Sequence, residues 1–360
     1  MAEDRQEQFS GTKQVAENHR FDEAALYDYL AAHIDGFAGP MQVEEFKGGQ
    51  SNPTYKLVTP DRSYVLRRKP PGLLLKSAHA VDREYKVITA LNKTNVPVPQ
   101  TFCLCEDESI IGTIFYVMEF VAGRVIWEPL VPGVTVEERR QIFDSQVAFM
   151  ADLHMVDYKA IGLEDFGKPG NYFARQISRW TKQYQASETE EIVEMNRLID
   201  WLPGNIPDDD SVSLVHGDFR LDNAVLHPTE PRIVAVLDWE LATLGHPLGD
   251  FTYHLMQWRN PDSALGVTPE AELKAMGIPT EAEYAAAYCA RTGRDEITNL
   301  DYYFAYNFFR LAGILQGIRG RVRDGTAASE QAIEMSSRVR PLAEAAWLYA
   351  QKAGEAFFYI

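Results

Sequence analysis

Apolar and polar residues alternate along much of the chain between residues 42 and 120, with short turn-forming segments between the alternating runs. Alternation of this kind is typical of half-buried strands. The expected strands cover residues 43–46, 54–58, 63–67, 101–105 and 113–120. Residues 78–91 have helical spacing instead, with Val81, Tyr85, Ile88 and Leu91 on one face. We therefore expect an antiparallel sheet with one helix inserted after its third strand.

The pattern changes at Gly123, beyond which helical periodicity dominates. The expected helices cover residues 137–156, 173–185, 188–202 and 281 to the end of the chain. A strand-rich island interrupts them between Ser213 and Trp239. Before the sheet, residues 22–34 have helical spacing, whereas residues 1–20 are expected to be loosely attached. The predicted fold class is therefore α+β.

The length of the chain predicts two lobes, because 360 residues exceed the roughly 250–300 at which single cores stop growing. The expected division places an N-terminal helix and a β-rich, nucleotide-binding lobe in residues 1–121. A larger, mainly helical lobe for catalysis and acceptor binding then occupies residues 122–360. A cleft between two lobes is a common place for ligands.

The composition is that of a globular protein, with 46% hydrophobic and 24% charged residues. No apolar run approaches the roughly 20 residues that a membrane helix needs, and the first residues are polar and acidic rather than signal-like. We expect a cytoplasmic protein that binds no membrane. The three cysteines are expected to be buried thiols, because no second cluster of cysteine or histidine completes a metal site.

The formal charge of −17 is distributed unevenly. Residues 41–100 carry ten Lys or Arg against five acidic residues, so the remaining 300 residues sum to −22. Such a field would repel the phosphates of nucleic acids, which excludes a nucleic-acid partner. It permits one local anion site in the basic segment. On charge alone, a solvated sheet face rich in Lys and Arg explains that segment equally well.

The strand-rich island carries the candidate chemistry. Residues 214–223 have the sequence L-V-H-G-D-F-R-L-D-N, and a P-T-E-P turn then separates two short strands. Counted outward from the turn, Asn223 and Asp238 come to the same open end of the hairpin. Paired strands lie roughly 5 Å apart, so both oxygen side chains could reach one cation. A carboxylate with an amide oxygen suits Mg²⁺, which keeps water and phosphate oxygens as further ligands.

Two residues of the preceding loop fit phosphoryl transfer. Asp218 lies five residues before Asn223 and is placed to accept a proton from an attacking hydroxyl. Arg220 would supply a cation for the transferring phosphoryl group. Positioning and charge neutralisation are the main contributions a protein makes to this reaction.

The motif H-G-D-F-R-L-D-N resembles the catalytic loop of the protein-kinase-like fold, in the form found in aminoglycoside phosphotransferases and choline kinases. Residues 237–240, L-D-W-E, resemble that family's metal-binding D-F-G segment. The resemblance implies a bilobal fold with a small antiparallel N-lobe and a larger helical C-lobe, and it implies ATP and Mg²⁺ as cofactors. It assigns Asp218 as the catalytic base, Arg220 as a phosphate contact, and Asn223 and Asp238 as Mg²⁺ ligands.

Other segments fall in the family's order. Arg67 on the third strand resembles the basic residue with which the family contacts the α- and β-phosphates, and Arg68 is the alternative. Glu84 resembles the acidic partner of that residue. Asp250 resembles the buried acid that braces the catalytic loop. The loop expected to cover the phosphates consists of Gly48, Gly49, Gln50, Ser51 and Asn52. The expected hinge places Met118 as gatekeeper and uses the backbone of Glu119 and Val121 to bind adenine.

The segments Y-V-L-R-R-K-P-P-G, H-A-V-D-R-E-Y and L-D-W-E-L-A-T-L-G-H-P-L-G-D are most similar to the kinase-like domain fused to certain acyl-CoA dehydrogenases. The resemblance therefore implies a hydroxyacyl thioester as a candidate acceptor. A strongly acidic C-lobe instead favours cationic acceptors such as aminoglycosides or choline. The sequence does not decide between them, and it gives no indication of the oligomeric state.

The predicted function is ATP- and Mg²⁺-dependent phosphorylation of a hydroxyl on a small molecule. One alternative is a metal-dependent phosphoester hydrolase that uses His216, Asp218, Asp238 and His246, since H-x-D is a common metal-ligand spacing. A second alternative is a non-catalytic, nucleotide-binding protein of kinase-like fold. A Walker-type ATPase is excluded, because the sequence lacks G-x-x-x-x-G-K-[ST].

Overall fold

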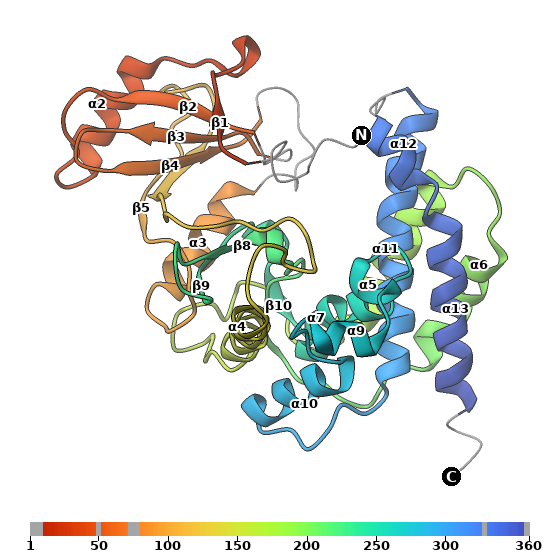
Figure 1. The fold of residues 1–360 in the computed structure, drawn as a ribbon. Helices are drawn as coiled ribbons and strands as arrows, with labels where there is room; N and C mark the ends of the chain where they lie inside the picture. Colours follow the sequence, from red (N-terminus) through yellow and green to blue (C-terminus); the bar gives the residue numbers. More distant parts are fainter. Residues whose placement is uncertain (1–9, 48–51, 71–79, 326–329, 356–360) are drawn as a thin grey trace. The chain divides into compact units, whose positions relative to one another are not determined.

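The computed structural model describes residues 10–47, 52–70, 80–325 and 330–355 (Figure 1). The chain divides into two compact units, and neither is one continuous stretch of sequence. The first unit is drawn from residues 1–166, 220–242 and 269–279, and the second from residues 167–219, 243–268 and 280–360. The assignment of nucleotide binding to residues 1–121 and of acceptor binding to residues 122–360 stays a prediction.

A six-stranded antiparallel sheet forms the N-terminal part of the first unit (Figure 1). Its strands are β1 (Thr12–Lys13), β2 (Gln42–Phe46), β3 (Thr54–Val58), β4 (Ser63–Arg68), β5 (Thr101–Cys105) and β6 (Phe115–Glu119), in the order β1-β2-β3-β4-β6-β5. The five predicted strands and the helix α3 (Val81–Leu91), which follows the third of them, are confirmed.

The expectation that residues 1–20 are loosely attached is wrong for the part that the structure describes. Thr12 of β1 pairs with Phe46, and the backbone N–H of Ala16 donates to the buried Glu45 carboxylate over 2.9 Å. The His19 ring also lies 3.0 Å from Glu45. Contacts made by polar groups at a sheet edge produce no hydrophobic periodicity in the sequence. The pattern of apolar residues therefore could not predict them.

The two faces of the sheet have different neighbours. Helix α2 (Glu23–His33) covers one face, where Leu26 and Leu30 pack into a cluster with Tyr64 and Leu66 of β4. Because side chains alternate along a strand, the intervening residues of β4 point to the other face. Helix α3 lies on that side, where its Glu84 contacts Arg67. Arg67 therefore lies on the α3 side of the sheet.

The first unit also contains the hairpin predicted from the strand-rich island. Its elements are η3 (Leu221–Asn223), β8 (Ala224–Leu226), β9 (Ile233–Val236) and η4 (Trp239–Leu241). Ala224 pairs with Val236, as the count from the turn predicts. The hairpin packs beside α4 (Val136–His154), which begins at a capping box between Thr135 and Glu138. The short helix α9 (Glu270–Ala275) completes this unit.

The second unit is mainly helical. Its longer helices are α5 (Tyr172–Ser187), α6 (Val193–Trp201), α7 (Pro247–Leu255), α10 (Glu281–Thr292), α11 (Leu300–Arg323) and α13 (Val339–Glu355), with the shorter α8 (Ala264–Val267) and α12 (Glu330–Ser336). Strands β7 (Ser213–Val215) and β10 (Thr243–Gly245) pair with each other. The aromatic residues of α11 are buried core, and the predicted helix beyond residue 281 is interrupted at Gly293, which ends α10 with φ at 70°.

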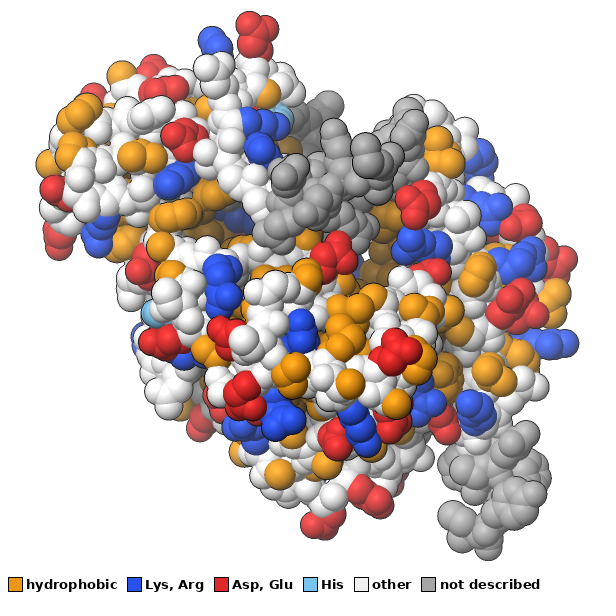
Figure 2. All heavy atoms as spheres, viewed as in Figure 1, with side chains coloured by type: hydrophobic (Ala, Val, Ile, Leu, Met, Phe, Trp, Pro, Cys, Tyr) orange, Lys and Arg blue, Asp and Glu red, His pale blue; other side chains and the backbone are white. Residues whose placement is uncertain are grey.

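Acidic and basic side chains are interspersed on the face drawn in Figure 2. Ion pairs form within each unit: Lys86 lies 2.7 Å from Asp165 in the first unit, and Arg319 pairs with Glu190 in the second. Within the described residues, no helix is both long and apolar enough to cross a membrane.

Candidate active site

Asn223 and Asp238 lie at the same open end of the β8–β9 hairpin. The Asn223 carbonyl accepts the backbone N–H of Leu237 at 2.8 Å, which extends the pairing by one residue beyond the strands. The next residue, Asp238, has φ and ψ of 65° and 61°, in the left-handed region. This conformation costs a non-glycine residue roughly 1–2 kcal/mol, although aspartate tolerates it better than most. The two predicted metal ligands are thus brought together.

The residues around Asp238 hold its backbone in that conformation. The Trp239 N–H donates to Oε1 of Glu84 at 3.2 Å, and its indole N–H donates to the Val236 carbonyl at 2.9 Å. The Trp239 ring is buried and packs edge-on against Phe149 of α4, with ring centroids 6.2 Å apart. The segment that carries Asp238 is therefore fixed on both sides.

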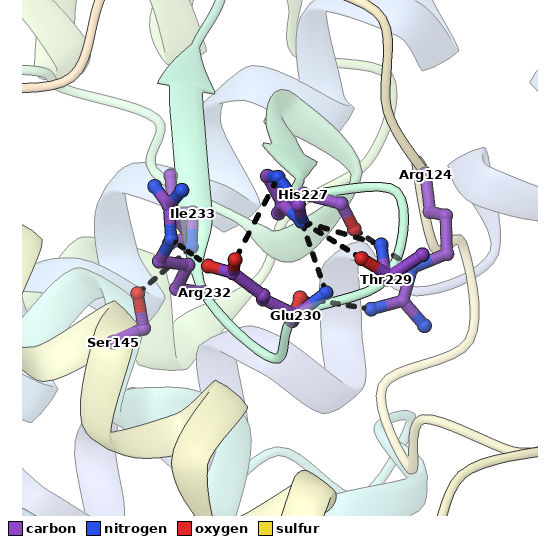
Figure 3. Close-up of polar contacts among 7 residues, drawn as sticks. All are labelled: Arg124, Ser145, His227, Thr229, Glu230, Arg232 and Ile233. Atoms are coloured by element: carbon purple, nitrogen blue, oxygen red, sulfur yellow. Dashed lines mark hydrogen bonds and ion pairs between the residues drawn. The ribbon is translucent and has the colours of Figure 1, made fainter.

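The turn of the hairpin is anchored from two directions (Figure 3). Arg124 donates from Nε to the His227 carbonyl at 3.0 Å and from Nη2 to the Glu230 carbonyl at 3.1 Å. On the other side, Oγ of Ser145 in α4 accepts the Ile233 N–H at 2.9 Å. The hairpin is thus tied both to α4 and to the segment that follows the predicted hinge.

Gly123 lets that segment approach the hairpin closely. A Cβ atom at this position would lie 2.2 Å from the carbonyl oxygen of Leu226 and 2.4 Å from Cγ1 of Val225. The next residue, Arg124, exchanges two backbone hydrogen bonds of 2.8 Å with Leu226. A side chain at residue 123 would therefore push the hinge segment away from the hairpin.

Arg67 joins the sheet to two carboxylates. Its Nε lies 2.9 Å from Oε2 of Glu84 in α3, as an ion pair without the alignment of a hydrogen bond, and its Nη2 lies 2.8 Å from Oδ1 of Asp238. Burial alone would lower the pKa of Arg67, but the charges of Glu84 and Asp238 raise it overall. Burial raises the pKa of Glu84, and the Arg67 charge opposes that rise. Arg67 stays a cation.

Arg68, the alternative phosphate contact, points to the opposite face of the sheet. Its guanidinium is buried and donates to the Tyr55 hydroxyl at 3.1 Å and to the His19 carbonyl at 2.8 Å. It also lies over the Phe21 ring. Arg68 therefore ties the N-terminal segment to the sheet, and of the two arginines only Arg67 lies beside Asp238.

The predicted hinge is the end of β6. Met118 is buried and pairs with Val65, and Glu119 ends the strand. The Glu119 N–H donates to the Gln100 carbonyl at 2.7 Å. The contact of the Glu119 backbone with adenine stays a prediction. Val121 follows two residues later and is half-buried.

Of the predicted phosphate-covering loop, Gly48, Gly49, Gln50 and Ser51 lie outside the described residues. Asn52 is described and almost fully buried, and its amide donates to Oε2 of Glu240 at 3.4 Å. Because Glu240 follows Asp238 in η4, this contact joins the end of the predicted loop to the segment carrying a predicted metal ligand.

The catalytic-loop residues before Arg220 belong to the second unit. There the buried Asp250 accepts the backbone N–H groups of His216 at 2.9 Å and Gly217 at 2.8 Å. Gly217 has φ at 87°, which glycine adopts without strain. From α11, Nη2 of Arg310 donates to the Gly217 carbonyl at 2.6 Å. Asp250 thus braces the loop as the resemblance implied, and Arg310 is a second brace.

The half-buried Asp218 receives a hydrogen bond from Tyr253 of α7, whose hydroxyl lies 2.9 Å from Oδ1. The Asp218 N–H donates to Nδ1 of His216 at 3.3 Å, so His216 shapes the loop locally. The sequence pattern missed Tyr253 and did not single out Arg310 as a brace. The sequence feature that could have indicated a role for Arg310 is its position as a cation among the aromatic residues of α11.

Arg220 begins the part of the loop that belongs to the first unit. It is exposed, and its Nη2 lies 2.9 Å from Oδ2 of Asp222. Its contact with a phosphoryl group stays a prediction. The expectation that Asp218 lies near the metal ion held by Asn223 and Asp238 also stays a prediction.

The donor set fits Mg²⁺ rather than a softer metal. Asn223 and Asp238 offer an amide and a carboxylate oxygen, and Mg²⁺ prefers such ligands together with phosphate oxygens. No group of three or more His, Cys, Asp and Glu within the described residues is arranged to hold a metal ion. His246, which the hydrolase alternative requires, lies 3.4 Å from Asp209 and accepts the Leu248 N–H.

Residues 42–300 match the model of the phosphotransferase enzyme family, so the chain belongs to that family. A solved candidate aminoglycoside phosphotransferase from Ralstonia eutropha is 54% identical, with a TM-score of 0.86, over 92% of this chain and 99% of that one. Aminoglycoside phosphotransferase APH(4)-Ia, solved with AMP-PNP and hygromycin B, is 15% identical over 90% of this chain and 98% of that one, and shares the fold with a TM-score of 0.59. The predicted kinase-like α+β fold is thereby confirmed.

Two longer proteins are also similar to the chain. Mouse acyl-CoA dehydrogenase family member 10 is 43% identical over 95% of this chain and 32% of its own length. Human acyl-CoA dehydrogenase family member 11 is 40% identical over 93% of this chain and 44% of its own length. The chain thus spans less than half the length of each of these relatives, and the predicted resemblance to their kinase-like part is confirmed.

Proposed function

We propose that this protein is an ATP- and Mg²⁺-dependent kinase that phosphorylates a hydroxyl group of a small molecule. The observation that carries the proposal is the linked set of Arg67, Glu84, Asn223 and Asp238, which lie together although they are dispersed over about 170 residues of sequence. The family match supports the same reaction class.

In this proposal the nucleotide binds along the sheet of the first unit. The backbone at Glu119 and Val121 contacts adenine beside Met118. Arg67, held by Glu84, contacts the α- and β-phosphates. The segment from Gly48 to Asn52 covers the phosphates.

Transfer then needs one proton acceptor and one charge-stabilised leaving group. Asp218 takes the proton of the acceptor hydroxyl, and the oxygen of that hydroxyl attacks the γ-phosphorus. The bond between the γ-phosphorus and the bridging oxygen of the β-phosphate breaks, which releases ADP. Arg220 stabilises the transferring group. Asn223 and Asp238 would hold Mg²⁺, which neutralises charge on the phosphate oxygens when bound.

For the acceptor we propose a hydroxyacyl thioester. The support is the similarity to two relatives named for acyl-CoA, in which the matched segment is part of a longer polypeptide. The net charge of −17 favours cationic acceptors instead, so aminoglycosides and choline are the rival acceptors.

An ATP-consumption screen tests the proposal. Purified protein with Mg²⁺–ATP is offered hydroxyacyl thioesters, aminoglycosides, choline and sugars, with Asp218→Asn as the matched control. We expect ADP formation with a hydroxyacyl thioester and a loss of about 10²–10⁴-fold in the variant, the size of a general-base effect. Phosphoester hydrolysis without ATP would favour the hydrolase alternative. Binding of Mg²⁺–ATP in calorimetry without turnover on any acceptor would favour the non-catalytic one.

A further inference from the structure

Tyr253 is the side chain of α7 that contacts the predicted base directly. Its hydroxyl donates to Oδ1 of Asp218 at 2.9 Å, and the tyrosine is 8% exposed. Hydrogen bonds to charged groups are stronger and more directional than those between neutral groups. This contact therefore restricts rotation of the Asp218 carboxylate about its Cβ–Cγ bond.

Arg310 holds the Tyr253 ring in place. The Arg310 guanidinium lies 4.6 Å from the centroid of that ring, and its Nη2 donates to the Gly217 carbonyl at 2.6 Å. Arg310 is 5% exposed, so this cation–π contact is largely shielded from water and is correspondingly strong. One buried side chain from α11 thus fixes both the loop and the tyrosine that contacts Asp218.

The backbone of the loop has separate supports. Asp250 receives the N–H groups of His216 and Gly217, and Arg310 binds the Gly217 carbonyl. The Tyr253 hydroxyl contacts the carboxylate of Asp218. Removal of the Tyr253 hydroxyl therefore takes one contact from the carboxylate while Asp250 and Arg310 still hold the loop backbone.

We infer that Tyr253 is a positioning residue for phosphoryl transfer, which orients the Asp218 carboxylate toward the acceptor hydroxyl, with Arg310 holding the tyrosine ring. The inference rests on the proposed role of Asp218 as base. Orientation of a reacting group contributes strongly to rate, because small displacements from a productive geometry cost large factors.

The test compares two tyrosine-to-phenylalanine variants. Tyr253→Phe removes the hydroxyl and keeps the ring beside Arg310. Tyr284→Phe is the matched control, because Tyr284 is also buried in the second unit and its hydroxyl lies 3.0 Å from Nε2 of His254. Each variant loses one buried hydroxyl, so a general effect on stability should appear in both.

The first measurement needs no acceptor. In protein labelled with ¹³C at aspartate carboxyl carbons, the Asp218 resonance is assigned by its loss in Asp218→Asn. We expect Tyr253→Phe to shift that resonance and Tyr284→Phe to leave it in place. An Asp218 resonance that is the same in Tyr253→Phe and the parent protein would overturn the inference without bearing on the proposed function.

The second measurement is turnover with the acceptor found in the screen. We expect kcat to fall about 10- to 100-fold in Tyr253→Phe, the equivalent of one hydrogen bond to a charged group, with KM for ATP unchanged. In an Asp218→Asn background the same change should have no further effect on kcat. Parent-like kcat in Tyr253→Phe, or an equal fall in Tyr284→Phe, would contradict a positioning role. If the parent protein turns over no acceptor, the result counts against the proposed function. Tyr253 would then have no phosphoryl transfer in which to position Asp218, so the inference would fall with it.

Discussion

Nη2 of Arg67 lies 2.8 Å from Oδ1 of Asp238, so the predicted phosphate contact and a predicted metal ligand share one ion pair. Asp238 is partly exposed, whereas Arg67 is buried beside Glu84. The carboxylate of Asp238 is thus paired with the positive charge of Arg67, and the proposed Mg²⁺ would place a second positive charge beside the same carboxylate. Nucleotide and metal should therefore bind together rather than independently.

Asp238→Asn should remove the Mg²⁺ dependence of nucleotide binding. Asparagine tolerates the left-handed backbone that Asp238 adopts, so this variant removes the charge with little strain. We expect ATP affinity, measured by calorimetry, to become insensitive to added Mg²⁺. Asp61→Asn, in the exposed turn between β3 and β4, should keep the parent's Mg²⁺ response. An unchanged Mg²⁺ titration in Asp238→Asn would place the metal elsewhere.

Arg67→Met should destabilise the protein strongly, because it leaves the Glu84 carboxylate buried without its cation. Breaking a buried ion pair typically costs about 3–5 kcal/mol. Adding Glu84→Gln should recover a large part of that loss, since glutamine keeps an acceptor for the Trp239 N–H. Urea denaturation measures both variants. Equal stability of the single and double variants would mean that the pair is not a coupled, desolvated unit.

The same variants separate stability from nucleotide binding. In the double variant, which restores much of the stability, KM for ATP should stay at least 10-fold above that of the parent, because the phosphate contact is still missing; one lost charged hydrogen bond is worth about this much. A selective effect on the acceptor's KM would contradict the predicted role of Arg67.

Gly123→Ala should weaken ATP binding through the hinge. The added Cβ would meet backbone and side-chain atoms of β8 at 2.2 Å and 2.4 Å, so the hinge segment must move. We expect a lower melting temperature and a KM for ATP raised by about 10-fold or more, as displacement of a binding segment by 1 Å or so can cause. Gly204→Ala is the matched control, because no atom lies within 4 Å of its added Cβ. Normal ATP binding in Gly123→Ala would show that the hinge does not depend on this approach.

Stability should fall in acid partly because of His254. Burial lowers the pKa of His254 from 6.5 to about 4 in the folded protein. Above pH 6.5 the imidazole is neutral in both states, so its contribution is fully present. As the pH falls from 6.5 to about 4, the unfolded chain binds a proton that the folded protein does not, and stability is lost. The expected total is about 3 kcal/mol.

Urea denaturation of His254→Gln at several pH values checks this contribution. The variant should be less stable than the parent near pH 7, because the histidine bonds to Tyr284 and to the Phe219 carbonyl are altered. Its stability should then decline less than the parent's between pH 6.5 and 4. His33→Gln, at an exposed position of α2, is the control and should decline as the parent does. Parallel declines in parent and His254→Gln would exclude His254 as a source of acid sensitivity.

The hairpin was predictable because two local rules act on it. A strand has a period of two, and the P-T-E-P turn fixes where the count begins, so Asn223 and Asp238 had to reach the same end. Arg67 was predictable as far as its face of β4. The choice against Arg68 needed the structure, because it depends on the contacts of Arg68 with Tyr55 and His19 across the sheet.

Other parts of the site could not be predicted from local patterns. Tyr253 meets Asp218 across 35 residues of sequence, and Arg310 meets Gly217 across 93. Helical periodicity indicates that such residues are buried but not which distant loop they face. The strand β1 is only two residues long, which is too short for alternation to be visible.

Helix α11 lies beyond the segment that carries the family's motifs, since the family match ends at residue 300. From there Arg310 binds the Gly217 carbonyl, and Asn307 donates to the Gly249 carbonyl and the Thr252 hydroxyl in α7. Residues 42–300 contain every motif of the family, but the catalytic loop also needs side chains that lie after residue 300. A fragment trimmed to residue 300 would keep Asp218, Tyr253 and Asp250 but lose Arg310, which binds the loop at Gly217 and holds the Tyr253 ring.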